Sequence, residues 1–284
     1  MDTLGEINNT VIDSENEVVM WWLGQSGLAI KSSRLTIYID PYLSTWAEEV
    51  TRGQTNEHVR MCDIPIMPEQ IDHADYLFST HAHEDHFDPV SVPKIMDRSR
   101  QCRLVLPRAN LTKAEDEYGI PPERMIPMRG NDIYEEAGIH VRAIPQMHES
   151  FDETGEGFPY LGYVIRLGEV CIYHGGDCIL YPELIEQLRK YSLDVIMLPI
   201  NGRDEARHRI GMQGNMDIRE ACDTVRQLDY RLFIPLHYDM FTINTVDINE
   251  FLDFPDIRNN VLRNATLSVG KAFHYRKQAV PECE

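Results

Sequence analysis

Positive charge is scarce in this chain of 284 residues. Lysine and arginine together number 27, against 46 aspartate and glutamate residues, so the formal net charge is −19. An acidic surface repels the phosphates of nucleic acids and of anionic bilayers, because binding to either needs clustered basic groups. We therefore expect neither a nucleic-acid partner nor a membrane partner. A small anionic ligand stays open, since a local arginine cluster can override the overall field.

Long hydrophobic runs and secretion signals are also missing. No stretch of 18 apolar residues occurs, so no segment is expected to span a membrane. The opening residues, MDTLGE, do not form a basic, then apolar, then small-residue leader. We therefore expect a cytoplasmic protein with reduced, mostly buried thiols, because its cysteines show no CxxC spacing. These cysteines are Cys62, Cys102, Cys171, Cys178, Cys222 and Cys283.

No internal repeat and no long linker rich in proline, glycine or serine divides the chain, so we expect one domain over residues 1–284. Short β-rich runs separated by turns predict a series of strands, and apolar residues at helical spacing predict helices between them. This alternation favours an α/β fold in which two sheets pack face to face beneath outer helices. The predicted strands are 18–23, 28–30, 35–39, 75–79, 103–106, 139–144, 160–167, 170–173, 195–200 and 232–236, and the predicted helices are 181–188 and 217–228.

The motif STHAHEDH, residues 79–86, is the strongest chemical signal. It follows the apolar run 76–78, so its potential ligands leave a buried strand and stay near the core. His81 and His83 can turn toward one metal ion, whereas the adjacent Asp85 and His86 can reach a second. Neutral imidazole and carboxylate groups bind divalent ions of borderline softness. The alternative is a solvated polar loop with incidental histidines.

Other polar residues follow strand ends farther along the chain. They are His148, Asp177, Asn201 and His237. The glycines before Asp177 would let the backbone approach a crowded centre. Taken alone, His148 or His237 would be interpreted as a histidine at the surface or at the edge of the core. Together with residues 79–86, these positions predict that acidic and imidazole groups converge on one edge of a sheet.

The chain resembles the metallo-β-lactamase superfamily over residues 20–273. The resemblance lies in the order of four features along the sequence: HxHxDH at 81–86, a single histidine at 148, Gly-Asp at the strand end 176–177 and a histidine at the strand end 237. This resemblance implies a four-layered αβ/βα sandwich with metal ions at one edge of the packed sheets. Finer features are similar to the L-ascorbate-6-phosphate lactonase group, although the segment between His148 and Tyr160 is shorter than that group's. These features are WWLGQSG at 21–27, DP at 40–41, YHGGD at 173–177, GNM at 214–216 and IPLHYD at 234–239.

The resemblance implies two divalent ions, with Mn and Zn both suited to the donors and Fe possible as well. Two such ions can share a water and lower its pKa toward neutrality, which makes hydroxide available to attack a lactone or ester. Asp177 would bridge the ions and orient this nucleophile, and Asp85 is a ligand that can also accept a proton. The implied ligands are His81, His83 and His148 for one ion, Asp85, His86 and His237 for the other, and Asp177 for both.

Three residues are predicted to contact a small, anionic substrate such as a phosphorylated sugar acid: Asn201, Arg203 and Tyr238. Arg203 belongs to the segment 201–209, NGRDEARHR, whose arginines could bind phosphate or carboxylate through paired hydrogen bonds. The alternative is a solvated loop in which neighbouring acidic residues balance these arginines. Hydrogen bonds that orient the imidazole rings are expected from Thr80, His174 and Asp239.

Two other functions compete with lactone or ester hydrolysis. Phosphodiester hydrolysis would call for a basic channel or an added nucleic-acid domain, and the net charge of −19 argues against both. A metal-binding sensor without turnover is the other alternative. The intact Asp177 opposes it, because a purely structural site has no need of two open ions. We also expect a homo-oligomer.

Overall fold

The computed structural model describes residues 2–136, 138–151 and 153–278. Within these ranges, the strands of one sheet are β1 (Glu17–Gly24), β2 (Gly27–Lys31), β3 (Thr36–Ile39), β4 (Tyr76–Phe78), β5 (Arg103–Pro107), β6 (Met125–Met128) and β13 (Ala272–Arg276). The strands of the other are β7 (Ile133–Glu136), β8 (Ile139–Pro145), β9 (Leu161–Leu167), β10 (Val170–His174), β11 (Leu193–Pro199) and β12 (Tyr230–Leu236). Their orders are β13-β1-β2-β3-β4-β5-β6 and β12-β11-β10-β9-β8-β7.

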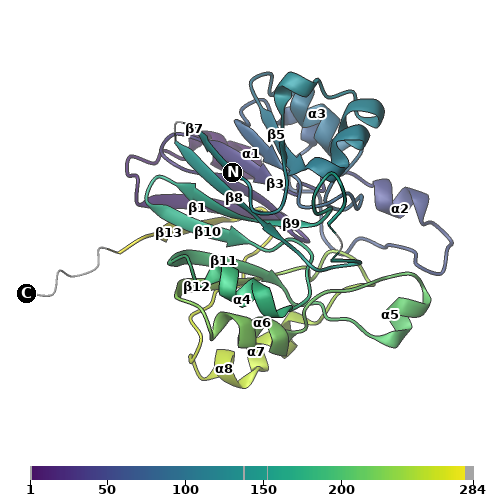
Figure 1. Ribbon diagram of the computed structural model, residues 1–284, viewed down its shortest axis with the longest axis vertical. Helices are drawn as coiled ribbons and strands as arrows, with labels where there is room; N and C mark the ends of the chain where they lie inside the picture. The colour runs from purple at the N-terminus through teal and green to yellow at the C-terminus, as the bar shows by residue number, and fades with distance from the viewer. Residues whose placement is uncertain (1, 137, 152, 279–284) are drawn as a thin grey trace, which may run out of the picture.

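Helices cover the outer face of each sheet (Figure 1). The α-helices are α1 (Thr3–Asn9), α2 (Trp46–Val50), α3 (Ser91–Arg98), α4 (Pro182–Leu188), α5 (Glu205–Arg209), α6 (Ile218–Val225), α7 (Ile248–Asp253) and α8 (Pro255–Arg258). Short helical turns occur at η1 (Pro68–Gln70), η2 (Arg108–Asn110), η3 (Lys113–Glu117) and η4 (Pro122–Arg124). Helices α1 and α3 lie over the first sheet, and α4, α6 and α7 lie over the second (Figure 1). This arrangement confirms the predicted four-layered sandwich.

Alternation along β1 shows how the sequence creates two buried layers. Val18, Met20 and Trp22 belong to the core cluster that also contains the second sheet. Their neighbours Val19, Trp21 and Leu23 pack instead with residues of α1 and α3. Successive side chains of a strand point to opposite faces, so a strand covered on both sides must be apolar throughout. The unbroken run at 18–23 is therefore the signature of a sheet buried between two layers.

Helix α6 illustrates how the outer layer is fixed. Asp217 accepts a hydrogen bond from the backbone N–H of Glu220, whose carboxylate in turn accepts one from the Asp217 N–H. Such a reciprocal cap satisfies two backbone donors at the first turn. Ala221, Cys222 and Val225 are buried on one side of the helix. The helix predicted over residues 217–228 is confirmed, although it ends at Val225.

The two sheets present their polar strand ends at a common edge. Strands β3, β4 and β5 run parallel in the first sheet, and β10, β11 and β12 run parallel in the second. Hydrogen bonds join the sheets where these strands end: the Leu161 N–H donates to the Thr80 carbonyl at 2.9 Å, and the His237 N–H donates to the Gln25 carbonyl at 3.0 Å. The loops that follow these strands are therefore held against one another.

Every predicted strand and both predicted helices overlap an observed element, but β6, β7 and β13 were not expected. No helix among the described residues has both the length and the apolar character needed to cross a bilayer. The five described cysteines are free, and all but Cys62 are buried. This confirms the expected buried thiols at those positions, and Cys283 lies outside the described residues.

Candidate metal centre

Seven side chains from both sheets converge at the common edge. Within each of three overlapping groups, the potential ligand atoms all lie within 4.8 Å of one another. We call His81, His83 and His148 the first half-site, and Asp85, His86 and His237 the second half-site. The third group, His81, His86 and Asp177, connects them. All seven residues that the sequence suggested as metal ligands are thus brought together.

Two buried atoms that face the middle of this cluster, His86 Nε2 and Asp177 Oδ1, lack the partners that buried polar atoms normally have. His81 Nε2 lies 2.9 Å from His83 Nδ1, and His237 Nε2 lies 3.2 Å from Asp177 Oδ2. His86 Nε2 and Asp177 Oδ1 are buried and 3.3 Å apart, but they do not form an aligned hydrogen bond. Unpaired buried polar groups are costly. Nitrogen and oxygen lone pairs converging in this way fit divalent cations.

Asp40 fixes the orientation of two of the imidazoles. Its Oδ2 accepts a hydrogen bond from His86 Nδ1 at 2.8 Å and another from the Thr80 hydroxyl at 2.6 Å. The Thr80 hydroxyl uses its only hydrogen in the bond to Asp40. It therefore accepts a hydrogen bond from His81 Nδ1, which lies 3.0 Å away. Both rings therefore carry their proton on Nδ1 and turn the Nε2 lone pair inward, as metal ligation requires. The predicted role of Thr80 is confirmed.

His83 is oriented from the opposite side. Its Nε2 lies 3.3 Å from Glu149 Oε1, and the other oxygen of this carboxylate, Oε2, accepts a hydrogen bond of 2.8 Å from the Tyr160 hydroxyl. This pairing places the proton on Nε2 and leaves Nδ1 directed at His81. The Tyr160 ring lies against the first half-site, with its centroid 5.3 Å from that of His148.

The electrostatics of the cluster suit cation binding. Burial lowers the pKa of His81 well below its ordinary value and the pKa of His148 to about 4, so both rings are neutral at pH 7. Burial opposes ionisation of Asp177, but the nearby imidazoles of His237 and His86 hold the pKa of its carboxyl well below the usual range. The neutral rings of His81 and His148 and the ionised carboxylate of Asp177 are in the protonation states in which such groups bind metals. Burial opposes the charge on His86, but the carboxylates of Asp177, Asp85 and Asp40 raise its pKa well above the ordinary value, so this ring would release a proton when it binds a cation.

Left-handed backbone conformations gather at this edge. Gly176, which precedes Asp177, has φ +60°, and a Cβ on it would lie 2.7 Å from Thr80 Cβ. Only glycine permits so close an approach, which bears out the role predicted for the glycines. The non-glycine residues Gln25, Asp40 and His237 also have positive φ, at 53°, 44° and 66°. Such strain is tolerated where the surroundings fix a functional side chain.

Three of the predicted roles are corrected. Tyr238 is not a pocket residue: it is 2% exposed, its ring centroid lies 4.6 Å from that of Trp22, and it belongs to the hydrophobic core. His174 contacts none of the clustered imidazoles, because its Nε2 donates to the Ser26 carbonyl and its Nδ1 accepts from Gly176. Asp239 lies in the turn after His237, where its backbone N–H donates to the Thr245 hydroxyl, and makes no hydrogen bond to a clustered ring.

The polar groups of Asn201 and Arg203 already have protein partners. The Asn201 amide nitrogen donates to Asn244 Oδ1 at 2.8 Å, and its oxygen accepts from Asn215 at 3.1 Å. The Arg203 guanidinium makes two hydrogen bonds with Glu220, at 2.5 and 2.6 Å. Arg203 lines a cavity of about 300 Å³ beside His148. Arg203 therefore lies beside a potential metal ligand, and the carboxylate of Glu220 balances its charge.

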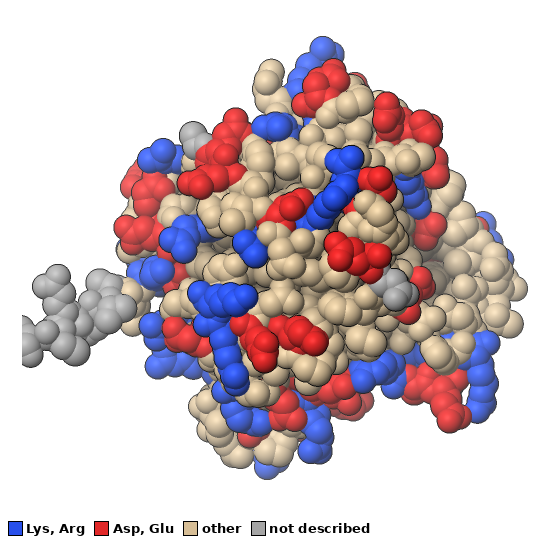
Figure 2. Space-filling view, in the orientation of Figure 1, with Lys and Arg blue, Asp and Glu red and all other residues tan. Residues whose placement is uncertain are grey.

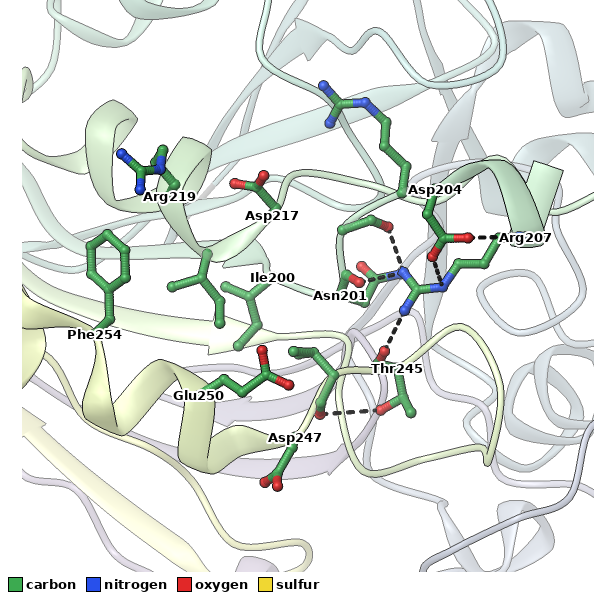
Figure 3. A pocket seen from close by; sticks show the side chains of 14 residues that line it. Ile200, Asn201, Asp204, Arg207, Asp217, Arg219, Thr245, Asp247, Glu250 and Phe254 are labelled. Atoms are coloured by element: carbon green, nitrogen blue, oxygen red, sulfur yellow. Dashed lines mark hydrogen bonds and ion pairs between the residues drawn. The ribbon is translucent and has the colours of Figure 1, made fainter.

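Arg207 is the arginine of this segment that supports the loop. Its guanidinium donates to the carbonyls of Asn201, Gly202 and Thr245 (Figure 3). These bonds fix the wall between the cavity beside His148 and a second cavity of about 490 Å³, because Arg203 and Asp204 line both. Nothing in the sequence indicates which arginine of the segment 201–209 supports the loop.

Replacing Arg207 with alanine is expected to lower the free energy of unfolding by about 1.5–3 kcal/mol, because carbonyls bonded to a charged donor would lose it. Thermal or urea unfolding would measure this loss. Arg209→Ala is the matched control: its side chain is 76% exposed, compared with 21% for Arg207, and its partner Glu205 is also exposed. We expect Arg209→Ala to change stability by less than about 0.5 kcal/mol. Equal losses in both variants would contradict the role given to Arg207.

Four positioning residues were missed as such: Gln25, Asp40, Glu149 and Tyr160. Gln25 lies in the segment 21–27 and Asp40 in the segment 40–41, both of which resemble the L-ascorbate-6-phosphate lactonase group. The resemblance did not indicate which side chains these two residues contact. Glu149 directly follows His148, so adjacency was its only signal.

Comparison with known proteins covers the whole segment that carries the centre. Residues 36–238 match the family described as beta-lactamase superfamily domain. A UPF0173 metal-dependent hydrolase of Pyrobaculum neutrophilum is 30% identical over 234 residues, which cover 81% of this chain and 88% of that protein. Another of that name, from Pyrobaculum calidifontis, is 29% identical over 236 residues, with the same coverage of 81% and 88%. The solved structure of Igni18, a metallo hydrolase from Ignicoccus hospitalis, has a TM-score of 0.67 at 22% identity and covers 92% of this chain and 100% of its own.

Proposed function

We propose a function from the premise that this chain belongs to the metallo-β-lactamase superfamily. It is a metal-dependent hydrolase. The observation that carries this conclusion is the convergence of seven potential ligands around two buried atoms, His86 Nε2 and Asp177 Oδ1, that have no hydrogen-bond partner. The first half-site would hold one divalent cation, the second half-site another, and Asp177 would contact both.

The finer proposal is that this hydrolase opens a lactone or an ester of a small sugar acid. The cavity beside His148, about 300 Å³, suits a small molecule rather than a polymer. Arg203 and His208 line it and would receive a phosphorylated or carboxylated substrate. Two acidic residues also line it, and each is paired with an arginine: Asp204 with Arg207 and Glu205 with Arg209. Arg203 is already bonded to Glu220, and His208 to Gln213 at 2.9 Å, so an anionic group would share these donors with their present partners.

The residues of the centre divide the chemistry among them. Bound divalent cations supply a water of lowered pKa and polarise a carbonyl group. Asp177 faces both half-sites, so its carboxylate would fix the direction of attack. Asp85 keeps part of its carboxylate exposed, at 19%, and would accept a proton and pass it to solvent. The Tyr160 ring, packed against His81, His83 and His148, would exclude bulk water from the first half-site.

Phosphodiester hydrolysis is the second candidate and is less well supported. A polymeric phosphate substrate needs a continuous basic surface. Figure 2 shows lysine and arginine interleaved with aspartate and glutamate on the visible face, without a continuous basic band. The net charge of −19 acts in the same direction. A sensor without turnover would not need a carboxylate that faces both half-sites, as that of Asp177 does.

A substrate panel tests the proposed reaction. We expect protein loaded with manganese, or separately with zinc, to hydrolyse a phosphorylated sugar lactone faster than bis-p-nitrophenyl phosphate. Initial rates over a range of substrate concentrations would give kcat/KM for each compound. Arg203→Ala should raise KM for the phosphorylated lactone more than for an uncharged one.

The same panel can contradict the proposal. Turnover of the diester alone would replace lactone or ester hydrolysis with phosphodiester hydrolysis. Equal effects of Arg203→Ala on charged and uncharged lactones would remove Arg203 from the substrate site. Binding of metal without turnover of any compound would favour the sensor.

A further inference from the structure

Gln25 occupies a strained position at the edge of the metal centre. It lies in the turn between β1 and β2, is 2% exposed, and has φ 53°. Its carbonyl accepts hydrogen bonds of 3.0 Å from Trp22 Nε1 and from the His237 N–H. A glutamine in the left-handed region costs on the order of 1–3 kcal/mol unless its surroundings enforce it. These two bonds are the enforcing contacts.

The Gln25 side chain enters the second half-site. Its amide nitrogen lies 2.8 Å from Asp85 Oδ2 and 3.1 Å from His237 Nε2. An ionised carboxylate only accepts hydrogen bonds, so the NH₂ group rather than the amide oxygen must face Asp85. One amide group thus contacts two of the three residues that form this half-site.

Other clustered residues are held by different groups. Thr80 orients His81, Asp40 orients His86, and Glu149 orients His83. Within the described residues, the only hydrogen bond to the Asp85 side chain is the one from Gln25. His237 Nδ1 is buried without a hydrogen-bond partner. Gln25 therefore contacts both Asp85, through its amide, and His237, through its amide and its backbone carbonyl. In the first half-site, His148 Nδ1 is likewise buried without a hydrogen-bond partner.

We propose that Gln25 is the positioning residue of the second half-site and sets the cation affinity there without affecting the first half-site. This inference rests on the proposed two-cation function. Asp85 Oδ2, which accepts the amide bond, also lies 3.6 Å from His86 Nε2, and a carboxylate keeps further lone pairs with which to bind a cation. The contact between the Gln25 amide and His237 Nε2 gives way when that nitrogen binds a cation. Groups that orient metal ligands in this way typically contribute a factor of about 10–100 in metal affinity.

Titration of metal-free protein with Mn²⁺ tests the proposal. Gln25→Leu removes the amide while keeping a side chain of similar size. We expect calorimetry to show two sites in the wild type, and in the variant an unchanged first site and a second site weakened about 10–100-fold. At two equivalents of Mn²⁺, electron paramagnetic resonance should show a spin-coupled pair in the wild type and isolated ions in the variant. Neither measurement depends on turnover.

Matched variants separate this role from a general effect on folding. Gln187→Leu removes a partly buried amide on α4, away from the centre, and should bind both ions as the wild type does. Gln25→Asn keeps the amide but shortens the side chain by one methylene, so it should also weaken cation binding at the second half-site. This variant replaces Gln25→Leu in the test if the leucine variant does not fold. An unchanged or tighter second site in these Gln25 variants would overturn the proposal and leave the two-cation function intact. A wild type that binds fewer than two ions would overturn both.

Discussion

Asp177→Ala is expected to reduce kcat on the order of 10³-fold or more, because the carboxylate that faces both half-sites is lost. Its two oxygens lie 3.3 Å from His86 Nε2 and 3.2 Å from His237 Nε2. Asp85 Oδ2 also lies 3.6 Å from His86 Nε2, but Asp85 is grouped only with the ligands of the second half-site. Metal content should fall in the same variant. Steady-state kinetics and elemental analysis of the purified protein would measure the two effects.

The control for Asp177→Ala is the loss of an exposed carboxylate elsewhere. Asp116 lies in η3 and faces solvent, and Asp116→Ala should retain wild-type turnover and metal content. Circular dichroism should show that both variants keep the native secondary structure. If Asp177→Ala kept full activity, its role between the half-sites would be wrong.

Removal of metal by a chelator is expected to abolish hydrolysis and to lower the melting temperature. A ligand present at about 100 times its Kd stabilises the folded state by about 2.7 kcal/mol. For a chain of 284 residues, that difference corresponds to a shift in Tm of about 4–5 °C for each site. Differential scanning calorimetry of the metal-free and reloaded protein would measure the shift, with activity recorded on the same samples.

Restoration with different ions makes this test specific. Mn²⁺ and Zn²⁺ accept a donor set rich in imidazole, whereas Mg²⁺ prefers oxygen ligands and gives up its waters reluctantly. We therefore expect Mn²⁺ or Zn²⁺, but not Mg²⁺, to restore both activity and Tm. Full activity after exhaustive chelation would show that the cluster does not depend on metal for catalysis.

The sequence was most informative where ligands lie close together or follow a strand. His81, His83, Asp85 and His86 share one loop, so their spacing alone indicates a metal site. His148, Asp177 and His237 are distant in sequence, but each follows an apolar strand. Parallel strands of one sheet end at the same edge, and this geometric rule predicted their convergence.

Positioning residues could not be recognised in the same way. The contact between Gln25 and His237 spans 212 positions and depends on left-handed backbone at both residues. No periodicity encodes such a contact. Tyr238 was wrongly predicted because it adjoins a ligand: His237 turns toward the centre, and the next side chain packs into the core beside Trp22. Adjacency in sequence near a strand end places neighbours on opposite sides.

The division of the centre between two sheets has a consequence for the cooperativity of folding. Loops of the first sheet carry residues 81–86, and loops of the second carry His148, Asp177 and His237. A cation bound by residues of both sets of loops loses its coordination when these loops separate, so its binding free energy stabilises the folded state and opposes opening between the sheets. Metal-loaded protein should therefore unfold as one unit, whereas the stripped protein is free to open along the seam between its sheets.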